Sequence, residues 1–278
     1  MRPKKSLGQN FLRDEKVLTE IIASAKLNAN DNVIEVGPGE GVLSTKLNER
    51  VGKLIMIEKD EQLSKNLAKN FKFQISNFKS ISNDKTFNSE NKSIVFVGDI
   101  LEINLPELIE KNNFGNYKLI ANIPYYITSP IIRMFLETKY PPQEMILMVQ
   151  REVAERICAP AGQMSLLSVS VQYYATPEIL FYVDKKSFWP VPEVDSAIIK
   201  IVPDGKTPDK KTTVNFFRTV KAGFCAKRKT LSNNLTSSFQ LDKKTIEEKI
   251  KKAGLVPTQR AQELNIADWK KLANLMSD

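Results

Sequence analysis

Strand-like and helix-like patterns alternate along the first two hundred residues. Short apolar runs predict buried strands at 32–36, 53–57, 93–97, 117–121 and 145–149. Apolar residues recur at helical spacing at 17–22, at 42–49, from about residue 60, and at 129–137. Strands that alternate with helices are typical of parallel sheets, so we expect an α/β domain with a mostly parallel, doubly wound sheet.

The pattern changes after residue 204. Phe217, Val220 and Phe224 mark the apolar face of one predicted helix, and Leu231 and Leu235 mark the apolar face of the next. Two further helices are predicted over 241–253 and 268–276. We therefore divide the chain into an α/β domain, residues 1–204, and a small helical domain, residues 205–278.

Positive charge is concentrated in the second of these domains. Residues 205–278 contain 16 Lys and Arg against 7 Asp and Glu, whereas residues 1–204 contain 25 of each, so the helical domain carries the whole net charge of +9. This distribution favours a module that faces a polyanion such as RNA, with Lys227, Arg228 and Lys229 as the residues that bind it. A solvated, lysine-rich helical surface is the alternative.

Candidate cofactor contacts stand at the ends of three successive strands. The turn Gly37-Pro38-Gly39-Glu40-Gly41 follows the first strand, Glu58 ends the second, and Asp99 follows the third. Val42 occupies the position where a dinucleotide fingerprint requires its last glycine, so the pattern departs from that of NAD-binding proteins. We expect S-adenosylmethionine instead, with Gly37 and Gly39 against its amino-acid part, Glu58 on its ribose and Asp99 on its adenine. Ordinary turn glycines and solvated or helix-capping carboxylates are the alternative.

Asn122-Ile123-Pro124-Tyr125 suits the methylation of an adenine amine. That amine is a poor nucleophile because its lone pair is delocalised into the ring, and two acceptors aimed at its N–H groups can draw it towards tetrahedral geometry. The Asn122 side-chain oxygen offers one acceptor and the Ile123 carbonyl the other, while Tyr125 offers a flat face for the base. An ordinary turn with an aromatic anchor is the alternative.

Composition excludes several other chemistries. The chain contains no histidine, which removes Ser-His and Cys-His mechanisms and most zinc sites. Its two cysteines, Cys158 and Cys225, are far apart and are expected to be small buried residues, so we predict neither a disulfide nor a metal site. No apolar run approaches the ~18 residues of a membrane span, and the N-terminus lacks the pattern of a signal peptide, so we expect a cytoplasmic protein without a membrane partner.

The interval between Glu58 and Asp99 is longer than a single helical crossover requires. Residues 72–92 are rich in Lys, Ser and Asn and are expected to form a flexible surface insertion.

Together these motifs resemble the ribosomal RNA adenine N6-dimethyltransferase family. The resemblance includes 6–12, 35–39, 57–58, Asp99, 122–125 and 188–196. It implies a Rossmann-like class I methyltransferase domain that binds S-adenosylmethionine, in which Asn10 and Leu12 close over the cofactor and Asn122 lies beside it. It also implies that a flipped adenine lies between Tyr125 and Phe188. For the neighbouring Tyr126 we expect packing in the core.

The C-terminal motifs at 223–235 and 258–264 resemble the branch of the family that acts on the small subunit. The resemblance implies dimethylation at N6 of two adjacent adenosines near the 3′ end of small-subunit (16S) ribosomal RNA, within a pre-30S particle. No coiled-coil heptad demands a dimer, so we expect a monomer. An enzyme for large-subunit RNA or DNA, and a non-catalytic ribosome-assembly protein of the same fold, are the alternatives.

Overall fold

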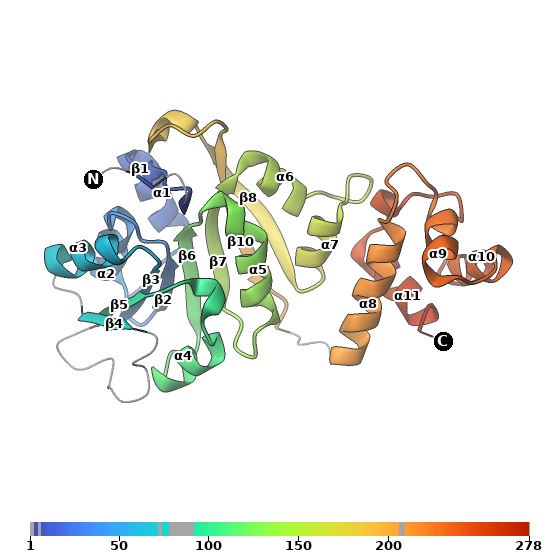
Figure 1. The fold of residues 1–278 in the computed structure, drawn as a ribbon, viewed down its shortest axis with the longest axis horizontal. Helices are drawn as coiled ribbons and strands as arrows, with labels where there is room; N and C mark the ends of the chain where they lie inside the picture. The colour runs from blue at the N-terminus through green and yellow to red at the C-terminus, as the bar shows by residue number, and fades with distance from the viewer. Residues whose placement is uncertain (1–2, 5–6, 72–73, 78–91, 206–208, 278) are drawn as a thin grey trace. The chain divides into compact units, whose positions relative to one another are not determined.

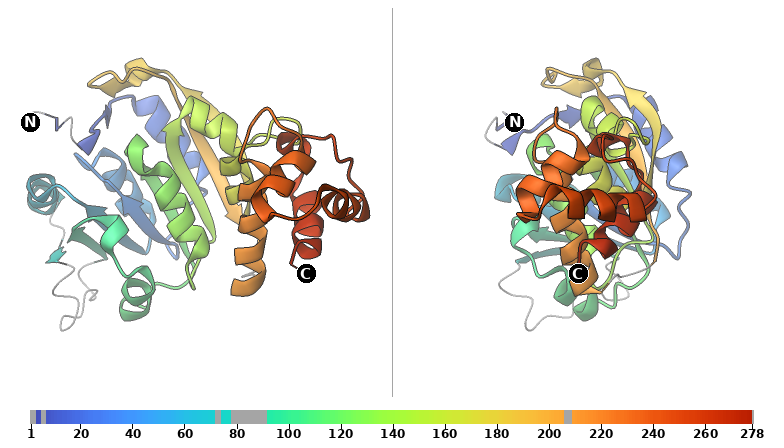
Figure 2. Two further views of the ribbon diagram at one scale, coloured as in Figure 1. Left: turned by 45° about the vertical axis from the view of Figure 1, so that its right-hand side comes forward. Right: turned by 90° about the vertical axis from the view of Figure 1, so that its right-hand side faces the viewer.

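The computed structural model describes residues 3–4, 7–71, 74–77, 92–205 and 209–277. It divides into two compact units, the first made of 1–154 with 177–203 and the second of 155–176 with 204–278 (Figures 1 and 2). The sequence-based division has the same junction near residue 204, but it leaves 155–176 in the first domain.

The first unit is built on an eight-stranded sheet of order β4-β5-β3-β2-β6-β7-β10-β8 (Figure 1). The strands are β2 (Asn32–Val36), β3 (Lys53–Glu58), β4 (Gln74–Asn77), β5 (Ser93–Val97), β6 (Tyr117–Asn122), β7 (Glu144–Gln150), β8 (Ala175–Val183) and β10 (Ser196–Pro203). Every pair from β4 to β7 is parallel, whereas β10 runs antiparallel to β7. The expected mostly parallel, doubly wound sheet is confirmed.

Helices connect these strands and cover the sheet. They are α1 (Glu15–Ser24), α2 (Val42–Arg50), α3 (Glu61–Phe71), α4 (Leu105–Lys111), α5 (Thr128–Glu137) and α6 (Arg151–Ile157), the last of which crosses the division between the units. The central strands are buried along almost their whole length because both faces of a parallel sheet are covered. This explains why short unbroken apolar runs identified them in the sequence.

The chain start and the loop before β10 form a second, small sheet. Phe11–Leu12 (β1) pairs antiparallel with Phe188–Trp189 (β9), so that Leu12 lies opposite Phe188. The Asp14 side chain then caps helix α1 by accepting from the amides of Lys16 and Val17. These contacts place the chain start next to the carboxyl ends of the large sheet.

The insertion differs in part from expectation. Residues 74–77 form strand β4, which pairs with β5 at the edge of the sheet, so this part is a strand and not a flexible excursion. Residues 72–73 and 78–91 lie outside the described residues.

The second unit is helical. Its helices are α7 (Leu166–Gln172), α8 (Lys210–Gly223), α9 (Leu231–Phe239), α10 (Lys243–Lys252) and α11 (Ile266–Leu275). Tyr173 stacks on Phe216, with ring centroids 4.0 Å apart, and Trp269 is fully buried. The Asn234 amide donates to the carbonyls of Gly223 and Ala226, which fixes the turn between α8 and α9.

Candidate active site

The turn after β2 brings main chain to the edge of a cavity. Gly37, Gly39 and Gly41 all have positive φ, at 69°, 58° and 84°. A Cβ at Gly39 would also lie 3.2 Å from the Phe11 ring. Glycine is therefore required at this position by both backbone conformation and space.

Glu58 ends strand β3 and is only 7% exposed. Its two carboxylate oxygens accept from main-chain amides, Oε2 from Gly39 at 3.1 Å and Oε1 from Asp60 at 2.8 Å. Burial raises the pKa of Glu58, although these amide donors oppose the shift. Since each carboxylate oxygen can accept two hydrogen bonds, capacity for ribose hydroxyls remains.

Asp99 follows β5 and accepts from Lys59 at 2.8 Å and from the Leu101 amide at 3.0 Å. Burial acts to raise the pKa of Asp99, but the Lys59 ammonium and the Leu101 amide outweigh it and hold the pKa below its ordinary value. Asp99 is therefore an ionised acceptor at neutral pH.

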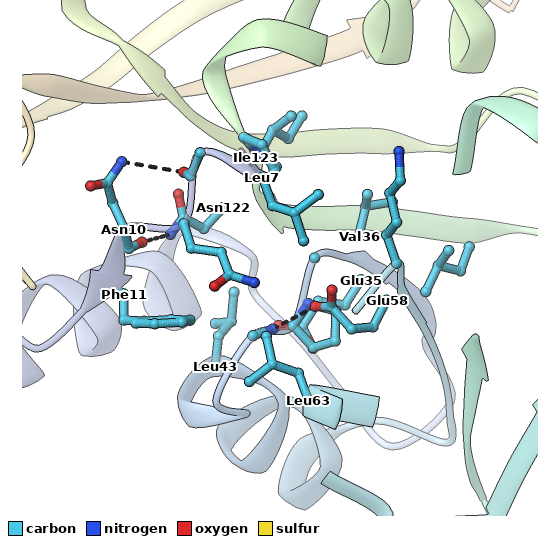
Figure 3. Close-up of a pocket in the computed structure, with 18 of the residues that line it drawn as sticks. Leu7, Asn10, Phe11, Glu35, Val36, Leu43, Glu58, Leu63, Asn122 and Ile123 are labelled. Atoms are coloured by element: carbon cyan, nitrogen blue, oxygen red, sulfur yellow. Dashed lines mark hydrogen bonds between the residues drawn. The ribbon is translucent and has the colours of Figure 1, made fainter. Parts of the chain in front are cut away.

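Asn122 is the last residue of β6, and the turn that follows it forms part of the cavity wall. Its Nδ2 donates to the Asn10 carbonyl at 3.3 Å (Figure 3). The Tyr125 hydroxyl lies 2.7 Å from Ser196 Oγ, and burial raises the pKa of Tyr125 even though this contact opposes the shift. The tyrosine ring is thus held at one end by a hydrogen bond while part of it stays accessible.

Most of the residues singled out in the sequence line this one cavity (Figure 3). They are Asn10, Leu12, Gly37, Gly39, Glu58, Asp99, Asn122 and Tyr125. The strand ends and the first turn therefore meet as their order along the sheet indicated, and the chain start joins them as the family resemblance implied.

Phe188 is placed differently. It is 2% exposed and belongs to the same hydrophobic core cluster as Leu12 and Leu18. It is not among the described residues that line the cavity. Its role as a wall for a base therefore stays a prediction that requires Phe188 to become accessible.

Several lining residues were not expected. Tyr126 is 57% exposed and lines the cavity, so the expectation that it packs in the core is wrong. Its ring lies beside Gly8, which also lines the cavity together with Leu7 and Phe11. An aromatic residue directly after the Asn-x-Pro-Tyr turn was the available signal for Tyr126. Leu7, Gly8 and Phe11 lie within the 6–12 motif, of which only Asn10 and Leu12 were assigned to the cofactor.

Glu35 is a buried carboxyl group at the base of the cavity, 1% exposed. Within the described part of the chain, its Oε2 and the Ser44 hydroxyl have no hydrogen-bond partner. Burial raises the pKa of Glu35 to about 8; the nearby Ser44 hydroxyl opposes the shift and the charge of Glu58 adds to it. Glu35 is therefore largely protonated at neutral pH.

In the second unit, Lys227, Arg228 and Lys229 are exposed in the turn between α8 and α9. Cys225, in the same turn, is also exposed, so the expectation that it is buried is wrong, and Cys158 is half-buried. Across the described ranges, no cluster of three or more His, Cys, Asp or Glu could hold a metal ion. Among the same residues, no helix is both long and apolar enough to cross a membrane.

Comparison with known proteins identifies the family. A protein of Dehalococcoides mccartyi named ribosomal RNA small subunit methyltransferase A is 41% identical over 98% of this chain and 88% of its own length. A protein of the same name from Clostridioides difficile is 38% identical over 98% of this chain and 90% of its own length.

Solved structures agree in fold. A dimethyladenosine transferase from Plasmodium falciparum superposes with a TM-score of 0.75 at 25% identity, covering 94% of this chain and 95% of its own. The 23S rRNA methyltransferase ErmE, at 24% identity and a TM-score of 0.71 over 96% of this chain and 100% of its own, shares the fold. Residues 1–278 match the family described as ribosomal RNA adenine dimethylase. With the match spanning the whole sequence, the chain belongs to the ribosomal RNA adenine dimethylase family.

Proposed function

We propose that this protein dimethylates N6 of two adjacent adenosines near the 3′ end of small-subunit (16S) ribosomal RNA, with S-adenosylmethionine as the methyl donor. The observation that carries the proposal is the position of Asn122. Its side chain lies on the wall of the same cavity as Glu58 and Asp99, so an amine held by Asn122 shares that cavity with the cofactor. The names of the full-length relatives support the choice of small-subunit RNA.

The cavity fits S-adenosylmethionine. The glycine turn with its positive φ values lets main chain approach the amino-acid part, and Glu58 keeps acceptor capacity for the ribose. Asp99 is an ionised acceptor for the adenine amine, and Glu35 places an unpartnered buried oxygen at the cavity base. Bound S-adenosylmethionine supplies a methyl group on a positively charged sulfur.

The chain's own residues activate the target amine by hydrogen bonding. Asn122 Oδ1 accepts one N–H of the adenine amine. We assign the second N–H to the Ile123 carbonyl, which directly follows Asn122 in the turn. The carbonyls of Pro124 and Tyr125 each already accept one hydrogen bond, from the Ile127 amide and the Thr128 hydroxyl. Once methylated, the amine is acidic enough to give its proton to water, which is consistent with a chain that contains no histidine.

The second unit is assigned to RNA docking. Lys227, Arg228 and Lys229 are exposed beside one another, and cations of this kind hold phosphates without reading bases. We propose that residues 205–278 form this RNA-binding domain, that the substrate is a pre-30S particle in the cytoplasm, and that the enzyme works as a monomer.

The role of Asn122 is tested with Asn122→Ala, with Asn66→Ala as the control, because Asn66 is a half-buried asparagine on α3 that is not among the described residues lining the cavity. We expect methyl transfer to fall at least about a hundredfold in Asn122→Ala, with RNA affinity within about twofold of wild type, because the acceptor for the amine is lost while the cations assigned to RNA binding are unchanged. Near-normal turnover in Asn122→Ala would refute the assignment.

The substrate is tested by incubating the protein with labelled cofactor and separated ribosomal subunits. Labelling of small-subunit RNA at N6 of adenosine is expected. Labelling restricted to large-subunit RNA would establish the first alternative. Tight RNA binding without cofactor binding in calorimetry would establish a non-catalytic assembly protein.

A further inference from the structure

The chain start forms a strap over the cavity. We define the N-terminal strap as residues 7–13. Leu7, Gly8, Gln9 and Asn10 line the cavity, and Phe11 and Leu12 join the strap to β9. At its far end Arg13 pairs with Glu40 at 2.6 Å, and Glu40 belongs to the glycine turn. The strap is thus anchored to strand β9 of the small sheet and to the glycine turn after β2.

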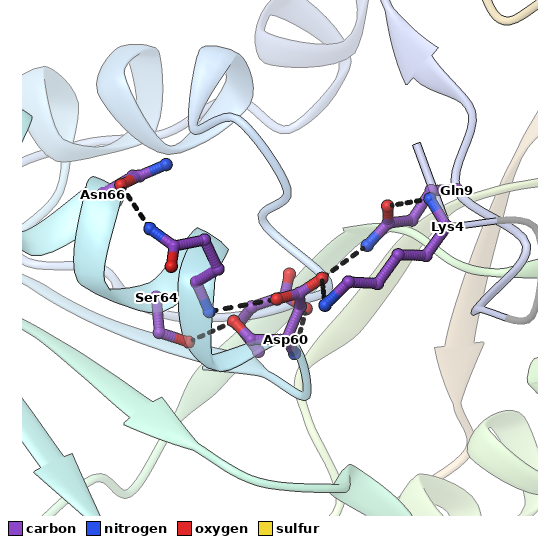
Figure 4. Close-up of polar contacts among 7 residues, drawn as sticks. Lys4, Gln9, Asp60, Ser64 and Asn66 are labelled. Carbon is purple, nitrogen blue, oxygen red and sulfur yellow. Dashed lines mark hydrogen bonds and ion pairs between the residues drawn. The ribbon is translucent and has the colours of Figure 1, made fainter. Parts of the chain in front are cut away.

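Asp60 holds the near end of the strap (Figure 4). Its Oδ2 accepts from Lys4 Nζ at 2.8 Å and from Gln9 Nε2 at 3.2 Å, and Gln9 Oε1 in turn accepts from the Lys4 amide at 2.8 Å. Its Oδ1 accepts from the Gln62 amide at 3.0 Å, and its side chain is 1% exposed. A buried carboxylate with both oxygens engaged has little freedom to rotate, so Asp60 gives the chain start a fixed point of attachment. We call these contacts of Lys4, Gln9 and Asp60 the latch.

The strap reaches the catalytic turn through Asn10. The Asn10 carbonyl accepts from Asn122 Nδ2 at 3.3 Å, and Asn10 Nδ2 donates to the Gly8 carbonyl at 3.3 Å (Figure 3). A carbonyl oxygen only accepts hydrogen bonds, so it selects the nitrogen of the Asn122 amide and turns Oδ1 away from the strap. The orientation of the amide therefore depends on where the Asn10 carbonyl lies.

This orientation has a chemical consequence that rests on the proposed function. An adenine amine can be held only by Oδ1, because Nδ2 would present a donor to a donor. A free asparagine side chain rotates and presents either atom. We propose that the latch makes the strap a positioning element for Asn122: Lys4 and Gln9 on Asp60 hold the Asn10 carbonyl in place, and that carbonyl presents Asn122 Oδ1 to the substrate amine.

The same segment packs directly on the catalytic turn. Gly8 has a φ of +60°, and a Cβ there would lie 3.4 Å from the Tyr126 ring and 4.0 Å from Pro124. The strap therefore contacts the turn on both sides of Tyr125. Movement of the strap would disturb the whole turn together with the Asn122 amide.

The test breaks the latch without touching Asp60, whose second oxygen caps α3. The variant is Lys4→Met/Gln9→Leu, which removes the three latch hydrogen bonds and keeps side-chain size. Lys4→Arg retains the charge and serves as the conservative variant. Lys65→Met is the matched control. Lys65 is exposed, and its ion pair with the exposed Glu61 on the same helix is long, at 3.8 Å.

Two measurements are made on the full-length protein. The first is the single-turnover rate of methyl transfer to small-subunit particles at saturating S-adenosylmethionine. We expect it to fall about tenfold in the double variant, because a tenfold change corresponds to the contribution of about one hydrogen bond, here that between Asn122 Nδ2 and the Asn10 carbonyl. The rate should stay within about twofold of wild type in Lys4→Arg and Lys65→Met. A wild-type rate in the double variant at saturating cofactor overturns the proposal, because the latch would then only cover the cofactor.

The second measurement does not depend on activity. With ¹⁵N-labelled asparagine, the side-chain NH₂ signal of Asn122 is identified by its loss in Asn122→Ala. Its hydrogen exchange is expected to be at least about tenfold faster in the double variant than in Lys65→Met. Unchanged exchange in the double variant overturns the proposal. If the double variant is too unstable to measure, the single variant Gln9→Leu is measured in its place, and unchanged exchange there has the same consequence. If wild type fails to methylate small-subunit RNA while the exchange result holds, only the proposed function fails.

Discussion

Replacing Glu35 with glutamine should remove a large part of the pH dependence of stability. Glu35 is 1% exposed, and burial raises its pKa to about 8 from an ordinary value of 4.5. Glutamine has the shape of the protonated acid and does not titrate. The Glu35→Gln change therefore removes the titration while keeping the packing around the group.

The sign and size follow from proton linkage. Because the pKa is higher in the folded state, the folded protein keeps the proton between about pH 4.5 and pH 8 while the unfolded chain releases it. The stabilisation is complete below that window and is lost as pH rises through it. The slope is at most about 1.4 kcal/mol per pH unit, so roughly 2.5 kcal/mol of unfolding free energy is lost by wild type between about pH 5.5 and about pH 7.5.

Urea unfolding followed by circular dichroism at these two pH values measures the effect. The unfolding free energy of Glu35→Gln minus that of wild type should rise by roughly 2.5 kcal/mol from the lower to the higher pH. Glu49→Gln is the control, because that side chain is 65% exposed. A difference between Glu35→Gln and wild type that is the same at both pH values would show that Glu35 is already ionised, and the argument from burial would fail.

Three further outcomes are expected. Cofactor binding at about pH 7 should release a proton, because a cation in the cavity favours ionised Glu35; calorimetry in buffers of different ionisation enthalpy would detect this in wild type and not in Glu35→Gln. Gly39→Ala should lose roughly 1 to 2 kcal/mol of stability and bind cofactor at least about tenfold more weakly, since its φ is positive and Phe11 is close; Gly115→Ala, with open space around the new methyl group, is the control for both thermal unfolding and calorimetry. Gly223→Ala should destabilise the second unit by roughly 1 to 3 kcal/mol in thermal unfolding, because the new Cβ would overlap the buried Trp269 ring, and an unchanged midpoint would contradict this packing.

Local sequence predicted the strands and their ends well, because those features are encoded over a few residues. The runs at 32–36 and 93–97 form strands with the expected limits, and Glu58 and Asp99 meet at one edge because parallel strands end on the same side. Features that depend on contacts between residues far apart in the sequence could not be predicted from local patterns. The pairing of Leu12 with Phe188 joins residues at opposite ends of the first unit, and it buries Phe188, which the motif alone assigned to an open wall. Strands β4, β8 and β10 of the large sheet were not predicted. For β4 the reason is that the polar sequence around it shows no apolar run.

The three groups assigned to the cofactor and substrate share one property that only the structure reveals. Glu58 accepts from Gly39, Asp99 accepts from Lys59, and Asn122 donates to Asn10. Each group is therefore held in position by a neighbour that itself lines the cavity, so the free enzyme does not have to order these side chains when its ligands arrive. Binding then uses the remaining lone pairs of oxygens that are already oriented, and little side-chain entropy is lost. A site that works by positioning and contains no histidine depends on this arrangement, because the rotation of one amide is enough to replace an acceptor with a donor.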